Sequence, residues 1–231
     1  MKVSLISYSQ GPMAKVETDN LGDVAVPSNK NLLDQVAYAA RVSNPANQNN
    51  TETSEKLVRY LIKHQHWSPL EMVSVCLEIE TTRDIARQIL RHRSFSFQEF
   101  SQRYADPTSD LGFVRRDARL QDTKNRQNSI ENDDIVLMAN WEQEQQKVIM
   151  QAQEAYAWAI EHGIAKEQAR AVLPEGNTVS RMYMNGTLRS WVHYIQLRSA
   201  NGTQKEHREI AIACAEAIKP IFPMIEEFIS E

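Results

Sequence analysis

The chain has 231 residues, of which 42% are hydrophobic, and this length can supply the core of one large domain or two small ones. Its net charge is −4 and its sequence pI is about 5.9, whereas general binders of nucleic acids or membrane surfaces carry a surplus of positive charge over a broad face. We therefore expect small molecules as partners, with no nucleic acid and no membrane, and we expect the local basic clusters to bind small anions.

The cysteine and glycine content indicates the cellular compartment and the kind of phosphate site that the protein can have. Cys76 and Cys214 are too few for a disulfide framework and form no zinc-binding pattern. The apolar run at residues 1–6 is too short for a signal peptide, and no run approaches the roughly 18 apolar residues of a membrane span. We therefore predict a soluble, cytoplasmic protein. The seven glycines form no phosphate-binding loop, so side chains must hold any nucleotide phosphate.

The first hundred residues alternate between strand and helix patterns. They predict a strand over 3–8, a helix over 32–40 capped near Ser28 or Asn29, a helix over 54–63, a strand over 73–80, and a helix from Thr82 to about Arg91. Residues 95–104 are predicted to be partly extended, so that Ser101 and Arg103 point the same way.

The second half reads mostly as helix. Residues 106–128 are polar and lack periodicity, which predicts a long loop or an interrupted hairpin. Apolar residues from Ile135 to Ala159 mark a long amphipathic helix that ends at Gly163, and further helices are predicted over about 166–172, 181–199 and 204–218. Because no repeat or linker is visible, we predict a single domain over residues 1–231, of the α/β (α+β) class, with a central mixed or antiparallel sheet flanked by helices.

Five arginines and no lysine fall between Arg83 and Arg103. The planar fork of arginine binds phosphate or carboxylate oxygens through paired hydrogen bonds. On an ordinary surface helix such arginines would pair with acids, but Asp84 and Glu99 are the only acids nearby. Serines and Tyr104 follow at fixed places, so we favour a site for an anionic ligand.

Other chemistries have weaker support. None of the serines in this segment sits in a Gly-x-Ser-x-Gly turn, and neither cysteine has the electropositive setting that activates a thiol. The histidines at 64, 66 and 92 lack a carboxylate or cysteine at a metal-binding spacing, so we predict no metal. An imidazole that binds a ligand or caps a turn is the better reading.

Four blocks in this order resemble the flavin-dependent thymidylate synthases, the family that methylates dUMP without a cysteine nucleophile. The hallmark is Arg91-His92-Arg93, followed after seven intervening residues by Ser101, which continues as Ser101-Gln102-Arg103-Tyr104. The other blocks are His66 to Glu71, Ala169 to Pro174, and Leu188 to Arg198 with Gln204 and Glu206 after it.

The resemblance implies which residues form the site. The dUMP contacts would be Gln88, Arg91, Glu99, Ser101, Gln102, Arg103, Arg170 and Arg198. Among them Ser101, Arg103 and Arg170 would suit the phosphate and Gln88 the sugar or base edge. Arg198 would be the catalytic group, which polarises the uracil ring. The FAD contacts would be Ser68, Arg91, His92, Arg93, Glu99, Thr187, Leu188, Arg189 and His193, with Thr187 standing where the family commonly has asparagine.

The resemblance also implies the reaction and the assembly. NADPH would reduce FAD, 5,10-methylenetetrahydrofolate would give the one-carbon unit, and hydride from the flavin would complete dTMP. Members are homotetramers with sites shared between subunits, so the helix from Ile135 to Ala159 is a candidate interface; alternatively, it packs on its own core. Two competing hypotheses are a non-catalytic nucleotide-binding protein of the same fold and a nucleic-acid binder that uses Arg115 to Arg126. The acidic net charge fits the second poorly.

Overall fold

A sheet of antiparallel strands in the order β1-β4-β8-β5 forms the centre of the molecule. Its strands are β1 (Lys2–Tyr8), β4 (Ser74–Thr82), β5 (Phe95–Glu99) and β8 (Val179–Thr187). Two shorter pairs join β2 (Ala14–Val16) to β3 (Val24–Val26) and β6 (Leu120–Gln121) to β7 (Ser129–Ile130). The computed structural model describes residues 1–10, 14–16, 24–26 and 31–230.

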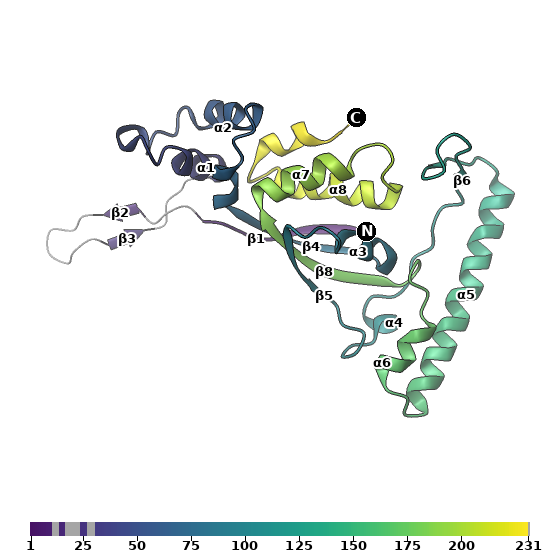
Figure 1. Cartoon of the computed structure of the whole chain (residues 1–231). Coiled ribbons are helices and arrows are strands. Elements are labelled where there is room, and N and C mark those ends of the chain that lie inside the picture. Colours follow the sequence, from purple (N-terminus) through teal and green to yellow (C-terminus); the bar gives the residue numbers. More distant parts are fainter. Residues whose placement is uncertain (11–13, 17–23, 27–30, 231) are drawn as a thin grey trace.

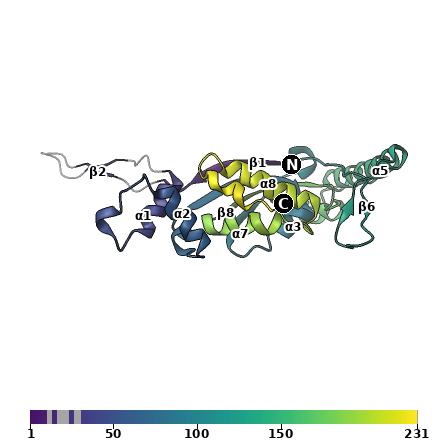
Figure 2. The same cartoon turned by 90° about the horizontal axis from the view of Figure 1, so that it is seen from above.

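Helices cover one face of this sheet and extend beyond its ends. They are α1 (Leu32–Ala40), α2 (Ser54–Lys63), α3 (Arg83–Ile89), α4 (Pro107–Asp110), α5 (Ile135–Glu161), α6 (Lys166–Ala169), α7 (Leu188–Arg198) and α8 (Lys205–Ile218), with 3-10 turns η1 (Pro45–Asn47), η2 (Ser68–Met72), η3 (Arg170–Val172) and η4 (Pro223–Phe228). Helices α7 and α8 lie over the sheet, whereas α5 stands at one end of an elongated molecule (Figures 1 and 2). None of the described helices has the length and apolar character that crossing a bilayer requires.

The predicted fold class is confirmed, and so are most of the predicted elements. Helix α2 has the predicted bounds, and β1 and β4 follow the predicted strands within a residue or two. The predicted caps Ser28 and Asn29 lie outside the described residues. Helix α1 is instead capped by Asn31, whose side chain accepts a hydrogen bond from the Asp34 N–H at 2.9 Å.

The helix predicted over 181–199 is wrong in its first half. Residues up to Thr187 form β8, which pairs with β4 on one side and β5 on the other. Alternate residues of β8 are buried, namely Ser180, Met182, Met184 and Gly186. Methionine and arginine favour helices, and they disguised this alternation. The usable signal was Thr187 three residues before Ser190, because its side chain caps α7 by accepting the Ser190 N–H at 3.3 Å.

The long segment predicted as a loop or interrupted hairpin is fixed to the body along its first part. Arg116 donates to Asp84 at 2.7 Å, and its backbone N–H donates to Gln145 of α5 at 2.7 Å. Val114 N–H donates to the Asn177 carbonyl at 2.9 Å. The tip beyond it is the small β6–β7 pair, so the prediction of an interrupted hairpin is the better of the two alternatives.

Helix α5 buries only a narrow stripe against the rest of the chain. The buried residues are Gln145, Ile149, Ala152, Tyr156 and Ala159. The predicted inward positions of its first half are exposed instead, with Ile135 79% exposed and Trp141 45% exposed. The pattern therefore predicted the helix correctly and its buried face only in the second half.

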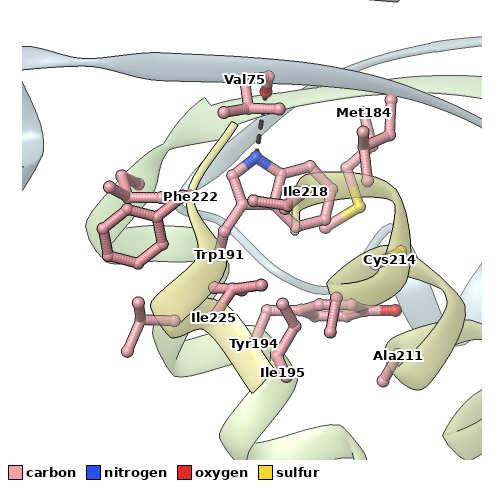
Figure 3. Close-up of a cluster of buried hydrophobic side chains, with 14 of the residues drawn as sticks. Val75, Met184, Trp191, Tyr194, Ile195, Ala211, Cys214, Ile218, Phe222 and Ile225 are labelled. Atoms are coloured by element: carbon pink, nitrogen blue, oxygen red, sulfur yellow. Dashed lines mark hydrogen bonds between the residues drawn. The ribbon is translucent and has the colours of Figure 1, made fainter. Parts of the chain in front are cut away.

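The core lies between the sheet and the pair α7 and α8, around the fully buried Trp191. The indole Nε1 donates to the carbonyl of Val75 in β4 at 2.9 Å (Figure 3). Side chains from β8, α8 and η4 surround the ring, including Met184, Cys214, Ile218, Phe222 and Ile225. A buried donor without a partner is costly, so this bond both orients the ring and fixes α7 on the sheet.

We expect Gly186→Ala to lower the free energy of unfolding by about 1–3 kcal/mol, because a Cβ at that position would lie 2.4 Å from Cδ1 of Phe95. The Phe95 ring packs edge-on against Trp191 at 4.8 Å and has little room to move. Urea denaturation measures the loss, and Phe95→Leu in the same chain should relieve part of it. Gly176→Ala, where a Cβ meets nothing within 4 Å, is the control. Equal stabilities of the two glycine variants would contradict the steric argument.

Candidate active site

The Arg-His-Arg segment forms a turn that is fastened to α7. Helix α3 ends at Ile89, two residues before its predicted end at about Arg91, so Arg91 lies in the turn that follows the helix. Arg198, the last residue of α7, donates from Nε to His92 Nε2 at 2.9 Å, and Ser190 Oγ donates to the Ser94 carbonyl at 3.2 Å. Two separate bonds therefore hold the turn against one helix.

His92 is a neutral acceptor in this arrangement. Arginine has only donors, so the ring nitrogen that faces Arg198 carries no proton, and Nδ1 carries the single proton of the imidazole. Burial, followed by the charges of Arg198 and Arg91, lowers the pKa of His92 to about 4. The ring also packs edge-on against Tyr194 at 4.9 Å. The Arg198 guanidinium thus has a defined orientation and a neutral partner.

Gln88 faces the same region from α3. Its amide bonds Gln204 at 2.8 Å and His207 at 3.2 Å, both of which belong to the start of α8. His207 is fully buried and also contacts the Tyr194 hydroxyl at 3.1 Å. Sequence reasoning did not place His207, Tyr194 or Gln204 near Gln88, because they come from segments far apart in the chain.

A second group of predicted residues surrounds a pocket of about 320 Å³. Its lining includes Arg83, Arg87, Gln102 and Arg170. Gln102 is 3% exposed, and its side-chain nitrogen has no hydrogen-bond partner among the described residues. A buried donor left free beside arginines is what an anionic oxygen would satisfy. Arg83 and Arg87 were not among the predicted contacts, although their spacing of four on α3 was a usable signal.

The residues after β5 frame this pocket differently from what we predicted. Strand β5 ends at Glu99, and Ser101 begins a turn in which its carbonyl accepts the Tyr104 N–H at 3.1 Å. The expectation that Ser101 and Arg103 share one side of an extended strand is therefore wrong. Arg103 instead reaches Glu167, beside the pocket, at 3.4 Å.

Glu99 lies beneath the pocket and is itself held in place. It accepts a hydrogen bond from Ser180 Oγ at 2.8 Å and pairs with Arg83 at 3.6 Å. Burial lowers the pKa of Arg83, and the Glu99 carboxylate opposes that effect. Glu99 therefore compensates part of the charge that the arginines bring to the pocket.

The residues predicted to hold FAD gather mainly where η2 meets the start of α7. His193 packs against Trp67 with ring centroids 4.6 Å apart and ring planes tilted by 57°, Arg189 pairs with Glu71, and Ser68 is exposed. Leu188 differs, because its side chain is fully buried and its N–H donates to the Val73 carbonyl at 2.9 Å.

The remaining predicted FAD arginines lie on the turn itself. Arg91 and Arg93 are exposed, and neither side chain forms a hydrogen bond or ion pair within the described part of the chain. Two unpaired guanidiniums next to one another suit a pyrophosphate.

The candidate nucleotide contacts, once Arg83 and Arg87 are added to the predicted ones, form two groups on adjoining faces of α3. Arg83 and Arg87 point to the pocket, and Gln88, about 100° further round the helix, points to α8. Among the described residues, no hydrogen bond or ion pair joins the group at Arg198 to the group at Arg103.

Comparisons with known proteins agree on one family. Residues 26–224 match the model of the thymidylate synthase complementing proteins. A probable flavin-dependent thymidylate synthase of Paramecium bursaria Chlorella virus 1 is 50% identical over 190 residues, which cover 82% of this chain and 87% of the relative. The chain belongs to the flavin-dependent thymidylate synthase family.

Further relatives support the same fold and family. The flavin-dependent thymidylate synthase of a Synechocystis species is 49% identical over 82% of this chain and 86% of its own. The crystal structure of the UMP/dUMP methylase PolB from Streptomyces cacaoi, bound with 5-Br dUMP, covers 98% of this chain and 93% of its own at 25% identity and a TM-score of 0.76. The family predicted from the four sequence blocks is therefore confirmed.

His92, in the Arg-His-Arg turn of this thymidylate synthase, and His207, close to it, should make the stability of the enzyme depend on pH. The pKa of His207 is lowered to about 3 by burial and then by Arg198 and His92, and that of His92 to about 4. Their ordinary value is 6.5, so below that pH the unfolded chain binds protons that the folded chain refuses. The free energy of unfolding should therefore be highest above pH 6.5 and fall as the pH drops toward 4.

Urea denaturation between pH 7.5 and 4.5 measures this slope. His207→Gln should lose part of it, even though the variant is less stable at neutral pH. His64→Gln, at the exposed end of α2, is the matched control and should keep the wild-type slope. A slope that is unchanged in His207→Gln would contradict the assignment to this buried histidine.

Proposed function

We propose that this enzyme methylates dUMP reductively to dTMP with the residues that the sequence blocks predicted. The chain is a flavin-dependent methyltransferase of the thymidylate synthase type, with FAD as cofactor and NADPH and 5,10-methylenetetrahydrofolate as the family's co-substrates. The observation that carries the assignment of residues is the Arg198 guanidinium, held by neutral His92 beside Gln88.

Arg198 serves as the catalytic group. Drawing electron density toward nitrogen 3 and oxygen 4 of uracil makes carbon 5 nucleophilic, and a fixed cation beside those atoms stabilises the charge that develops there. His92 supports this role because it takes a hydrogen bond from Nε without neutralising the guanidinium. The other two nitrogens of the guanidinium remain available to the ring.

The arginine-lined pocket serves as the phosphate site. Arg170 and the buried amide of Gln102 line it, and Arg103 reaches its edge through Glu167. Bidentate guanidinium contacts suit phosphate oxygens, and the free donor of Gln102 would gain a partner. Ser101, two residues after the end of β5, would contact the phosphate with them, and Glu99, the last residue of β5, would complete the dUMP contacts.

The donor set near α7 fits FAD. The unpaired Arg91 and Arg93 would hold the pyrophosphate, and the aromatic faces of Trp67 and His193, tilted by 57° to each other, would pack against a ring of the cofactor. FAD, when reduced, supplies the hydride that completes the methyl group. The task of the protein side chains is to bind and orient it. Thr187 acts through its cap on α7, which sets the direction of Arg189.

We infer that each site needs two copies of the chain. The Arg198 group and the phosphate group lie on adjoining faces of α3, and no hydrogen bond or ion pair among the described residues joins them, so a neighbouring copy would supply the second group, as the family resemblance implies. Helix α5 provides a surface for such an assembly, with Val136 69%, Val148 50% and Trp158 56% exposed. A homotetramer, as predicted from the family, satisfies both observations.

Nucleic-acid binding has little support. Three of the four arginines in the segment that would carry it pair with the protein's own acids: Arg115 with Glu142 at 2.8 Å, Arg116 with Asp84 at 2.7 Å, and Arg119 with Glu206. The single domain over 1–231 and the cytoplasmic location remain proposals from composition.

We expect Arg198→Ala to retain the flavin but to lower the rate of dTMP formation about 100- to 1000-fold, as for the loss of one preorganised electrostatic contact. Anaerobic single-turnover assays with reduced enzyme give the rate, and the flavin absorption band gives cofactor content. Arg59→Ala on α2, which removes an exposed arginine, is the control. Turnover of Arg198→Ala close to that of the control would sink the catalytic role.

We expect Arg103→Ala to weaken dUMP binding while the flavin stays bound. If each site combines two chains, co-expression of Arg103→Ala with Arg198→Ala should restore roughly a quarter of the sites, since each contributing chain is intact for its residue about half the time. Activity of the mixed preparation, compared with each variant expressed alone, measures this. No recovery in demonstrably mixed assemblies would mean that one chain supplies both groups.

A further inference from the structure

An unbroken chain of hydrogen bonds connects the segment after β5 to the centre of the site. Glu206 accepts from Arg119 and from Gln204 Nε2, the latter at 2.9 Å. Gln204 Oε1 then accepts from Gln88 Nε2 at 2.8 Å. Gln88 Oε1 faces His207 Nδ1 at 3.2 Å, and His207 Nε2 faces the Tyr194 hydroxyl at 3.1 Å. We call this chain of residues, from Arg119 to Tyr194, the Glu206 relay.

The direction of every hydrogen bond in the Glu206 relay follows from the carboxylate of Glu206. A carboxylate only accepts, so the amide nitrogen of Gln204 must face Glu206 and its oxygen must face Gln88. The nitrogen of Gln88 must then point to Gln204, which leaves its oxygen to accept from His207. Nδ1 of His207 therefore carries the proton, and Nε2 accepts from Tyr194.

The environment of the relay makes this direction costly to change. The side chains of Arg119 and Glu206 are 10% and 14% exposed, and His207 and Tyr194 are almost completely buried. A single reversed member would leave two donors or two acceptors facing each other away from water. The relay therefore changes direction as a whole or not at all.

We propose that the Glu206 relay fixes which end of the Gln88 amide faces the substrate. The positioning residues are Arg119, Glu206, Gln204 and His207, none of which was predicted to contact a ligand. This inference rests on the proposed contact between Gln88 and dUMP. After its two relay bonds, Gln88 keeps one hydrogen on Nε2 and one lone pair on Oε1, and their positions are set by the relay.

A change of one atom at Glu206 tests the direction. In Glu206→Gln, the amide oxygen stays with Arg119, which can only donate, so the amide nitrogen must face Gln204. Gln204 then has to turn its oxygen toward position 206, Gln88 has to turn over, and the proton of His207 has to move from Nδ1 to Nε2. The variant keeps the number of bonds and the shapes of the side chains, so a merely structural role would leave both readouts unchanged.

The first readout is the tautomer of His207, from nitrogen NMR of the whole enzyme labelled in its histidine rings, with assignment by His207→Gln. We expect the Nδ1–H form in the wild type and the Nε2–H form in Glu206→Gln. The second readout is dUMP affinity, which should weaken roughly tenfold or more because the reversed amide mismatches the nucleotide. Glu216→Gln, an exposed position on the same helix, is the control and should match the wild type in both.

The outcomes separate this inference from the proposed site. An Nε2–H tautomer in the wild-type enzyme overturns the relay without recourse to any variant. Unchanged dUMP affinity in Glu206→Gln despite a reversed tautomer overturns the link between the relay and the substrate. Unchanged affinity in Gln88→Ala shows instead that Gln88 does not contact dUMP, and the proposed site then fails at that residue.

Discussion

The hydrogen bond from Trp191 to the Val75 carbonyl sets the orientation on which the site depends. The indole has no access to water, so α7 cannot rotate on the sheet without losing a bond that nothing replaces. Arg198 lies seven residues further along, close to two helical turns, and so projects from nearly the same side of the helix. A rotation fixed in the core is thereby transmitted to the guanidinium at the helix end.

Two kinds of arginine follow from this architecture. Arg115, Arg116 and Arg119 form ion pairs with acids of the same chain and hold their segment against the helices. The arginines of the pocket have longer contacts with acids: Arg83 lies 3.6 Å from Glu99 and Arg87 lies 3.2 Å from Glu175. Because the whole protein carries a net charge of −4, its attraction for anions is confined to such places. An acidic protein can therefore bind a phosphate tightly while rejecting polyanions.

The sequence predicted the fold well where one signal dominated. The strict alternation before Thr82 and the apolar spacing of α2 gave elements with nearly correct bounds. It failed at β8, where Met182 and Met184 are compatible with either a helix or a strand, and pairing with β4 and β5 decides for the strand. The prediction for the buried face of α5 was also partly wrong, because the apolar pattern alone does not distinguish residues that pack on their own chain from residues that stay exposed on it.

For the candidate site, the sequence blocks predicted candidate residues but gave no indication of their partners. Arg198 and His92 are adjacent only because α7 folds back over the turn, a fact that no local pattern contains. His207 reads as one polar residue in a helix, and its burial between Gln88 and Tyr194 emerges only in three dimensions. Arg83 was within reach of sequence reasoning, since it shares a helical face with Arg87.

The segment over 106–128 has a first part that is bound to the rest of the protein and a tip that is held mainly by its own contacts. Its first part is bound to α5 through Gln145 and to α3 through Asp84, whereas the tip is closed by its own contacts, such as the Lys124 N–H to Asp122 at 2.7 Å. Length changes at the tip alter only a local turn. Insertions or deletions between Val114 and Arg119 would instead displace Arg116 or Arg119, which pair with Asp84 and Glu206. Evolution can therefore change the length of this loop at its tip but not in its first part.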